Sequence, residues 1–157
     1  MQFNKKYPHV QFEVYSADGD DLKRNLDENK LDMALLIEPV ESAKYTKIPI
    51  DVIEKWGLVI RSKEVSPKKK TLSYEEIIER TLILPRRYIV LSEISSWFKV
   101  PESKFKVIAY HNLASNALTM VEKGLGSLLC IEGSYTNRPR AGLRFLPLSP
   151  ERTTSHV

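Results

Sequence analysis

The chain has a single cysteine, no long apolar run and only a small excess of charge. Because Cys130 has no second cysteine to pair with, an internal disulfide is excluded, so the sequence does not fit the disulfide scaffolds of small secreted proteins and the cytoplasm is the expected location. The first ten residues, MQFNKKYPHV, contain no apolar signal core, and no stretch approaches the roughly 20 apolar residues of a membrane span. We therefore expect neither export nor contact with a membrane.

The charge balance does not by itself indicate nucleic-acid binding. The 24 Lys and Arg residues exceed the 20 Asp and Glu residues by a net charge of +4, and both signs are spread along the sequence. Hydrophobic residues make up 42% and charged residues 28% of the 157 residues, as in ordinary folded domains. This length suits one compact domain or two small lobes that share a core.

The spacing of apolar residues predicts strands and helices in alternation. The period of two in VQFEVY, residues 10–15, indicates a strand, and the apolar runs at 33–37 and 56–60 are typical of parallel strands that are covered on both faces. Further strands are predicted at 81–84, 106–110, 127–131 and 143–146, with 45–50 as an additional candidate, and helices at 20–28, after the Ser73 and Glu76 capping box, at 90–99 and at 113–121. This alternation indicates an α/β protein with βαβ units and parallel sheets.

The glycines of VEKGLGSLLC, residues 121–130, could suggest a phosphate-binding loop. Such a loop places its glycines after a strand and before a helix, so that free N–H groups face the anion. Here the order is reversed, because the predicted helix ends at Lys123 and the strand SLLCI follows the glycines. We therefore expect Gly124 to end the helix in the left-handed conformation and Gly126 to let the backbone pass closely into the sheet.

Four stretches of the chain, in this order, resemble the effector-binding domain of LysR-type transcriptional regulators. They are FNKKYPHVQFEVYSADGDDLKRNLDENKLDMALLIE (3–38), LILPRRYIVLSEISSWF (82–98), NLASNALTMVEKGLGSLLCIEGSY (112–135) and LRFLPLSPE (143–151). The resemblance implies a two-lobed, periplasmic-binding-protein-like α/β fold of type II, with Rossmann-like lobes joined by hinge strands. It places the first lobe at 1–55, the second at 56–148 and the start of a return segment toward the first lobe at 149–157.

The same resemblance implies a regulatory function. A small effector would bind in the cleft between the lobes, and the chain would form a homodimer or tetramer. DNA would be bound only through a winged helix-turn-helix domain that is absent from this chain, as are the family's first strand and its last strand and helix. Neither a cofactor nor a metal is implied.

Candidate effector-binding residues follow from the rule that ligands of open α/β sheets bind outside the carboxyl ends of the strands. The residues that follow the predicted strands in this way are Ser16, Ala17, Asp18, Glu38, Arg86, Arg87, Tyr88, His111, Asn112, Glu132 and Gly133. Arg86 and Arg87 stand just before a predicted helix, where guanidinium groups can hold a carboxylate or phosphate by paired hydrogen bonds. The sequence therefore predicts a small anionic effector.

Several of these residues also have ordinary structural explanations. Adjacent arginines are common on solvated surfaces, and His111 is in a position to cap the helix that begins near Leu113. The three histidines are too far apart in sequence to suggest a metal site. Cys130 lies in an apolar strand and is expected to be a small buried hydrophobe, and without a partner cysteine a peroxide-sensing role is unsupported.

Two other classes of function compete with the regulatory interpretation. A solute-binding protein of a transporter has the same fold, and an upstream signal peptide or lipoprotein cysteine would identify it. An enzyme on the same scaffold would need a catalytic motif, but the sequence contains neither a nucleophile elbow with Ser, His and Asp nor a clear Cys and His pair. We therefore expect that the chain is not an enzyme.

Overall fold

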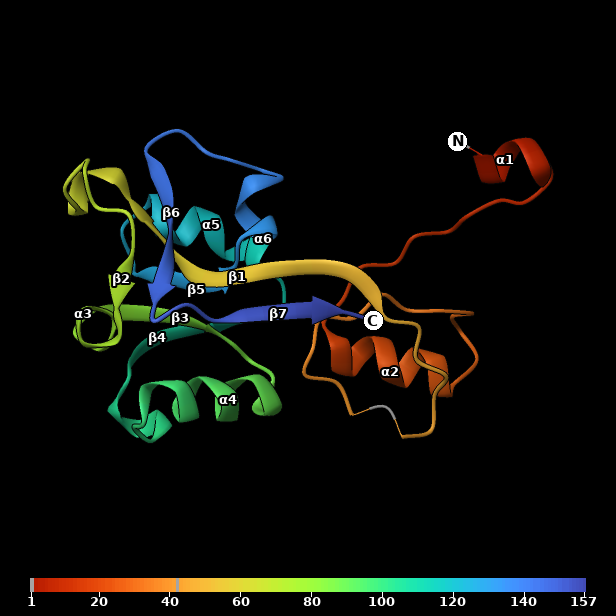
Figure 1. Cartoon of the computed structure of the whole chain (residues 1–157), viewed down its shortest axis with the longest axis horizontal. Coiled ribbons are helices and arrows are strands. Elements are labelled where there is room, and N and C mark those ends of the chain that lie inside the picture. Colours follow the sequence, from red (N-terminus) through yellow and green to blue (C-terminus); the bar gives the residue numbers. More distant parts are fainter. Residues whose placement is uncertain (1, 42) are drawn as a thin grey trace.

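The computed structural model describes residues 2–41 and 43–157 (Figure 1). In chain order the elements are α1 (Gln2–Lys6), α2 (Gly19–Asp27), β1 (Ile50–Arg61), the 3-10 turn η1 (Ser62–Glu64), β2 (Leu72–Ser73), α3 (Tyr74–Ile78), β3 (Thr81–Pro85), α4 (Tyr88–Phe98), the 3-10 turn η2 (Glu102–Lys104), β4 (Lys106–His111), α5 (Ala114–Glu122), β5 (Ser127–Ile131), α6 (Gly133–Thr136), β6 (Leu143–Ser149) and β7 (Thr153–His156). No helix in this part of the chain is both long and apolar enough to span a bilayer.

The strands form one mixed sheet in the order β2-β6-β1-β5-β3-β4, and β7 pairs with β1. Strand β3 is parallel to both β4 and β5, which confirms the predicted βαβ units in this part of the chain. The prediction of parallel strands is wrong for β1, which runs antiparallel to β5, β6 and β7. Its apolar run WGLVI indicates that the strand is covered on both faces, but such a run does not distinguish a parallel strand from an antiparallel one.

Helices cover both faces of the sheet, and successive side chains of its central strands point into two different apolar cores. In β3, Leu82 and Leu84 pack with α3 and α4, whereas Ile83 packs with α5 on the opposite face. The same alternation places Leu129 in the first core and Leu128 in the second. Side chains of successive strand residues point to opposite faces, so a strand with no polar interruption fills both layers.

Two local sequence signals are confirmed by the backbone. Ser73 and Glu76 form the capping box at the start of α3, because each side chain accepts the backbone N–H of the other. Gly124 follows the last residues of α5 with φ of 79°, a left-handed conformation that favours glycine. The GLG sequence therefore joins a helix to strand β5, as the order of elements predicted.

Strand β1 is long enough to leave the sheet. Its second half pairs with β5 and β6, from Trp56 to Arg61, while its first half pairs with β7, between Ile50 and Lys55. Figure 1 shows β1 and β7 running side by side from the sheet toward α2. Through β1 the chain passes into the sheet from residues 2–49, which we call the N-terminal segment, and β7 pairs with the first half of β1.

The N-terminal segment contains α2 as predicted, but it lacks the predicted strands. Residues 10–15 form no strand, and 33–37 contribute only a bridge from Ile37 to His156. The additional candidate at 45–50 is also wrong, because only Ile50 is in a strand. A strand needs a neighbouring backbone to satisfy its N–H and C=O groups, and the described residues place none beside 10–15. Figure 1 shows this stretch as an extended trace that ends at α1, away from the sheet.

Candidate functional site

A pocket of about 180 Å³ lies where three parallel strands end. Pro85, His111 and Ile131 are the last residues of β3, β4 and β5, and all three line the pocket. The opposite wall comes from the N-terminal segment, through residues 17–19, Leu22 and 35–38. The carboxyl ends of the strands thus face a wall that is contributed from elsewhere in the chain, which is the arrangement expected for a ligand site in an α/β sheet.

Most of the pocket lining is apolar. Its apolar side chains are Ala17, Leu22, Leu35, Leu36, Ile37, Trp56, Pro85, Val90, Leu113, Ala114, Cys130 and Ile131. The polar side chains in the lining are Asp18, Glu38, Arg87, His111, Asn112 and Ser134. A mainly apolar hollow with a few polar groups is typical of sites for small molecules.

The predicted site residues divide into two groups. Those that line the pocket are Ala17, Asp18, Glu38, Arg87, His111 and Asn112. Those outside its lining are Ser16, Arg86, Tyr88, Glu132 and Gly133. Tyr88 is exposed, and the backbone N–H of Gly133 donates to Glu54 rather than facing the pocket. Whether any of these residues binds an effector stays a prediction.

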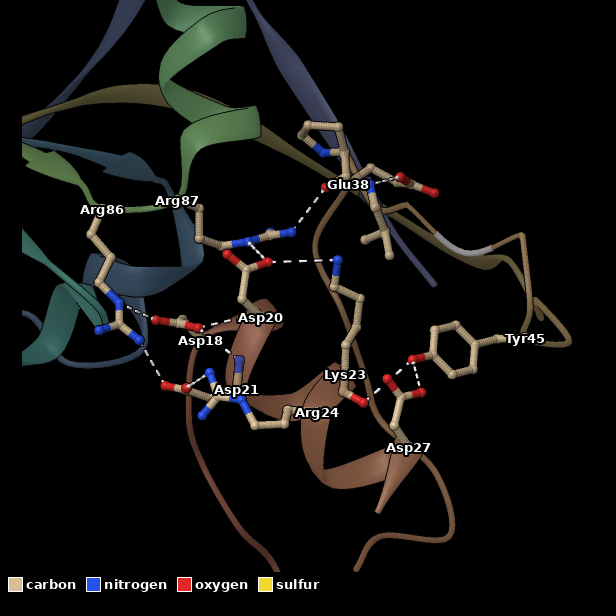
Figure 2. Close-up of polar contacts among 12 residues, drawn as sticks. Asp18, Asp20, Asp21, Lys23, Arg24, Asp27, Glu38, Tyr45, Arg86 and Arg87 are labelled. Carbon is tan, nitrogen blue, oxygen red and sulfur yellow. Dashed lines mark hydrogen bonds and ion pairs between the residues drawn. The ribbon is translucent and has the colours of Figure 1, made fainter. Parts of the chain in front are cut away.

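Asp18 begins α2 and joins it to the sheet. One of its carboxylate oxygens accepts the backbone N–H groups of Asp20 and Asp21, both at 3.1 Å, and the other accepts a hydrogen bond from Nε of Arg86 (Figure 2). Burial favours a higher pKa for Asp18, but Arg86 and the two backbone N–H groups outweigh it and hold that pKa below its usual value. Asp18 is therefore a charged N-cap that also contacts the β3–α4 connection.

Arg86 and Arg87 both point toward the first turn of α2 in Figure 2. Arg86 donates from Nη2 to Asp21 at 2.8 Å, in addition to its contact with Asp18. Nε of Arg87 donates to Asp20 at 3.2 Å, and its Nη2 donates to the carbonyl of Pro39 at 3.3 Å. The guanidinium groups that were predicted to hold an anionic effector thus already have carboxylate partners within the chain.

Gly19 permits the close approach of the Arg87 side chain. A Cβ atom at Gly19 would lie 2.9 Å from Cζ of Arg87, closer than real Cβ contacts. Arg87 is buried although it carries a charge, while Arg86 is exposed. A buried guanidinium requires hydrogen-bonding partners, which here are Asp20 and the Pro39 carbonyl.

Glu38 is fully engaged by its neighbours in the chain. Its carboxylate accepts from Lys47 at 2.7 Å and from the backbone N–H of Val40 at 2.6 Å. Its backbone carbonyl accepts from the hydroxyl of Thr154 in β7 at 2.7 Å. Glu38 therefore fixes the segment that follows residue 37 against β7.

His111 ends β4 with a ring that makes no normal hydrogen bond. Both ring nitrogens are buried and without a partner of good geometry among the described residues. Burial lowers the pKa of His111 to about 4, and a backbone group of Leu129 counters only part of this effect. The alternative explanation of His111 as a helix cap is wrong, because neither of its ring nitrogens has a partner in the described part of the chain and no side chain there caps the start of α5.

Cys130 lies in the pocket wall and is buried, which confirms the expectation that it packs as a small hydrophobe. Its burial, together with the nearby charge of Glu54, raises the pKa of the thiol well above its usual value. The reactive thiolate is thereby disfavoured. Among residues 2–41 and 43–157, no group of three or more His, Cys, Asp or Glu side chains is arranged to hold a metal ion.

The residues that sequence reasoning missed are mainly the apolar ones. Trp56, Val90 and Leu113 carry no polar signal, and an apolar side chain in a pocket looks the same in sequence as one in a core. Ser134 lies one position beyond the predicted Gly133, so extending the same rule by one residue would have found it. Leu22 lies within the helix predicted at 20–28, and its place in a helix does not indicate a pocket.

Comparisons with known proteins agree with the architecture. A family model described as "LysR substrate binding domain" matches residues 1–157. None of the curated proteins matches the chain. The chain is similar to the CcmR regulatory domain of Synechocystis PCC6803, solved in complex with 2-PG, with a TM-score of 0.77 and 12% identity over 99% of this chain and 76% of that chain.

Two further solved structures show the same likeness. The effector binding domain of a BenM variant has a TM-score of 0.73 and 17% identity, over 99% of this chain and 74% of that chain. HinK, a LysR family transcriptional regulator from Pseudomonas aeruginosa, has a TM-score of 0.73 and 15% identity, over 99% of this chain and 56% of that chain. The predicted type II periplasmic-binding-protein-like α/β fold is confirmed.

Proposed function

Because the chain belongs to the LysR substrate binding domain family, we propose that it is the ligand-sensing regulatory domain of a transcriptional regulator and that a small effector binds in the pocket at the ends of β3, β4 and β5. The family match does not favour the solute-binding alternative. LysR-type regulatory domains are not enzymes, and we propose no catalytic role.

The observation that carries the proposal is that one pocket has two walls from different parts of the chain. One wall is the N-terminal segment, and the other is formed by the sheet and the starts of α4 and α5. A molecule that contacts both walls binds most tightly when they are close together, so it shifts the population toward that arrangement. Strands β1 and β7 are the connection through which the walls can change their relative position.

The wider assembly follows from the family. We propose that residues 1–55 and 56–148 act as the two lobes and that 149–157 return toward the first. The effector-dependent arrangement of the lobes would alter how a cytoplasmic homodimer or tetramer presents DNA-binding domains that lie outside this chain. Contact with DNA would come only through those domains.

Titration calorimetry of the purified chain against a library of small metabolites tests the binding step. We expect at least one compound to bind at a single site and to raise the melting temperature. Substitution of Ala17 by Leu, which places added bulk in the pocket, should abolish that binding. Ala141→Leu is the matched control because Ala141 lines a separate hollow beside Arg61 and Gly142.

Two results would refute the proposed site. One is a library in which no compound binds and none shifts the melting temperature. The other is a compound whose affinity falls equally in the Ala17→Leu and Ala141→Leu variants, since that result would mean that the compound does not bind in this pocket.

A further inference from the structure

Every charged side chain in the pocket lining already has a partner of opposite charge that lies outside the lining. Asp18 pairs with Arg86, Glu38 pairs with Lys47, and Arg87 pairs with Asp20. None of the three partners is a lining residue. The pocket therefore has no unpaired charge to offer to a charged ligand.

An anion in this pocket would meet unfavourable electrostatics. The lining contains two carboxylates, of Asp18 and Glu38, but only one guanidinium, of Arg87. A ligand carboxylate would have to compete with Asp20 for Arg87 and would lie among apolar walls, where like charges repel more strongly than in water. A ligand cation would have to compete with Arg86 for the carboxylate of Asp18 and with Lys47 for the carboxylate of Glu38.

The uncharged polar groups of the lining favour a neutral ligand. The side-chain oxygen of Asn112 accepts from Leu113 and from Asn116, so its NH₂ group is the part that can donate to a ligand oxygen. Ser134 supplies a hydroxyl. One ligand hydroxyl or carbonyl is sufficient to satisfy these groups.

The size of the pocket limits the ligand further. An apolar cavity of about 150 Å³ lined by aliphatic and aromatic side chains holds one benzene molecule. The pocket here measures about 180 Å³, and its walls include Leu22, Trp56 and Val90. A single six-membered ring with a short substituent fits this space.

We infer that the pocket selects a small uncharged molecule, with an apolar ring of about benzene size and one hydroxyl or carbonyl group, and that Asp20 excludes monoanions by occupying Arg87. The inference rests on the proposed function, because it names the chemical class of effector for the same site. It departs from the anionic effector that the sequence predicts. Asp20 acts here as a specificity-determining residue that does not itself line the pocket.

Benzyl alcohol and benzoate are matched probes, since they share the ring and differ mainly in charge. Calorimetric titration of the wild-type chain should give a dissociation constant for benzyl alcohol that is about tenfold or more below that for benzoate. Benzoate binding as tightly as benzyl alcohol, or more tightly, would overturn the inference. That result would leave the proposed sensing function intact, because a ligand would still have been found in the pocket.

Two substitutions on the first turn of α2 separate the role of Asp20 from general effects of charge. Asp20→Asn removes the partner of Arg87, whereas Asp21→Asn removes a partner of Arg86, which is outside the lining. We expect Asp20→Asn to strengthen benzoate binding by about tenfold and to leave benzyl alcohol binding unchanged. Asp21→Asn should alter neither.

Equal benzoate affinities in the Asp20→Asn and Asp21→Asn variants would overturn the role given to Asp20. If neither probe binds the wild-type chain, the proposed ligand class is wrong. The metabolite library then still decides, independently, whether the domain senses a small molecule at all.

Discussion

The N-terminal segment and the sheet with its helices are held together by different kinds of contact. In the sheet, at residues 56–148, apolar side chains fill two continuous cores. Of the described residues before 50, only Leu22 and Leu36 are buried apolar side chains, while Val14 is 87% and Met33 is 80% exposed. The N-terminal segment is attached mainly by polar contacts, chiefly the ion pairs of Asp18 and Arg87 and the hydrogen bonds of Leu36 and Glu38 to residues 154–157. The sheet therefore has its own apolar stabilisation, and α2 depends on a few charged side chains.

The largest expected effect is on the free energy of unfolding, when a leucine side chain is shortened to alanine in each of the two regions. Leu129 is fully buried in β5, so Leu129→Ala should lower the free energy of unfolding by about 2–5 kcal/mol. Leu35→Ala deletes the same group from a side chain that is 62% exposed, and it should change the free energy of unfolding by less than about 0.5 kcal/mol. Urea unfolding of both variants measures the two values. Similar losses in the two variants would remove the contrast between the regions.

The second effect concerns His111, which lies where the two regions meet. The folded chain keeps this ring neutral, with a pKa of about 4, whereas the unfolded chain takes up a proton near pH 6.5. Stability should thus be complete above about pH 6.5 and fall as the pH falls toward 4, by about 3 kcal/mol from this one group. Urea unfolding at pH 7.5 and pH 5 measures the loss.

Replacing the ring isolates this contribution. His111→Gln should flatten the dependence of stability between those two pH values, whereas His9→Gln, at an exposed position, should leave it as in the wild type. A His111→Gln variant that loses as much stability as the wild type on acidification would show that other groups cause the loss.

The same contrast explains how much of the fold the sequence could reveal. Apolar runs such as 82–84 and 127–131 identify strands that are buried on both faces, because neighbours cover them in the finished sheet. VQFEVY has an equally clear period of two, yet 10–15 form no strand, since spacing records the preference of a segment and not the presence of a partner. Strand β7 was missed because TTSH is polar and pairs with the exposed half of β1.

The candidate site was predictable in its position but not in its chemistry. The carboxyl-end rule correctly found Arg87 and His111, since it needs only the order of elements, whereas Asp18 was named after a strand at 10–15 that does not form. The rule could not show that Arg87 meets Asp20, because these residues are 67 positions apart and their pairing depends on how α2 packs against the sheet. The anionic effector was predicted on the assumption that both arginines are unpaired.

The smallest expected effect tests the polar attachment of α2 directly. Asn is as good an N-cap as Asp, so Asp18→Asn keeps the contacts to the backbone of α2 and loses both the charge and the acceptor oxygen that face Arg86. We expect amide hydrogen exchange in the first turn of α2 to become roughly threefold to tenfold faster, as for an ion pair with one exposed partner. Asp27→Asn, at the far end of α2, removes a contact with Lys44 and should leave that turn unchanged.

The pH dependence of the same exchange rates identifies the charge as the cause. The pKa of Asp18 is below its usual value in the folded chain, so its contribution is complete above about pH 4 and is lost as the pH falls below that. Protection of the first turn of α2 should therefore decline more in acid for the wild type than for Asp18→Asn. Equal protection in both proteins at every pH would mean that Leu22 and Leu36 hold the helix through apolar contacts, and the two regions would then differ only in the number of such contacts.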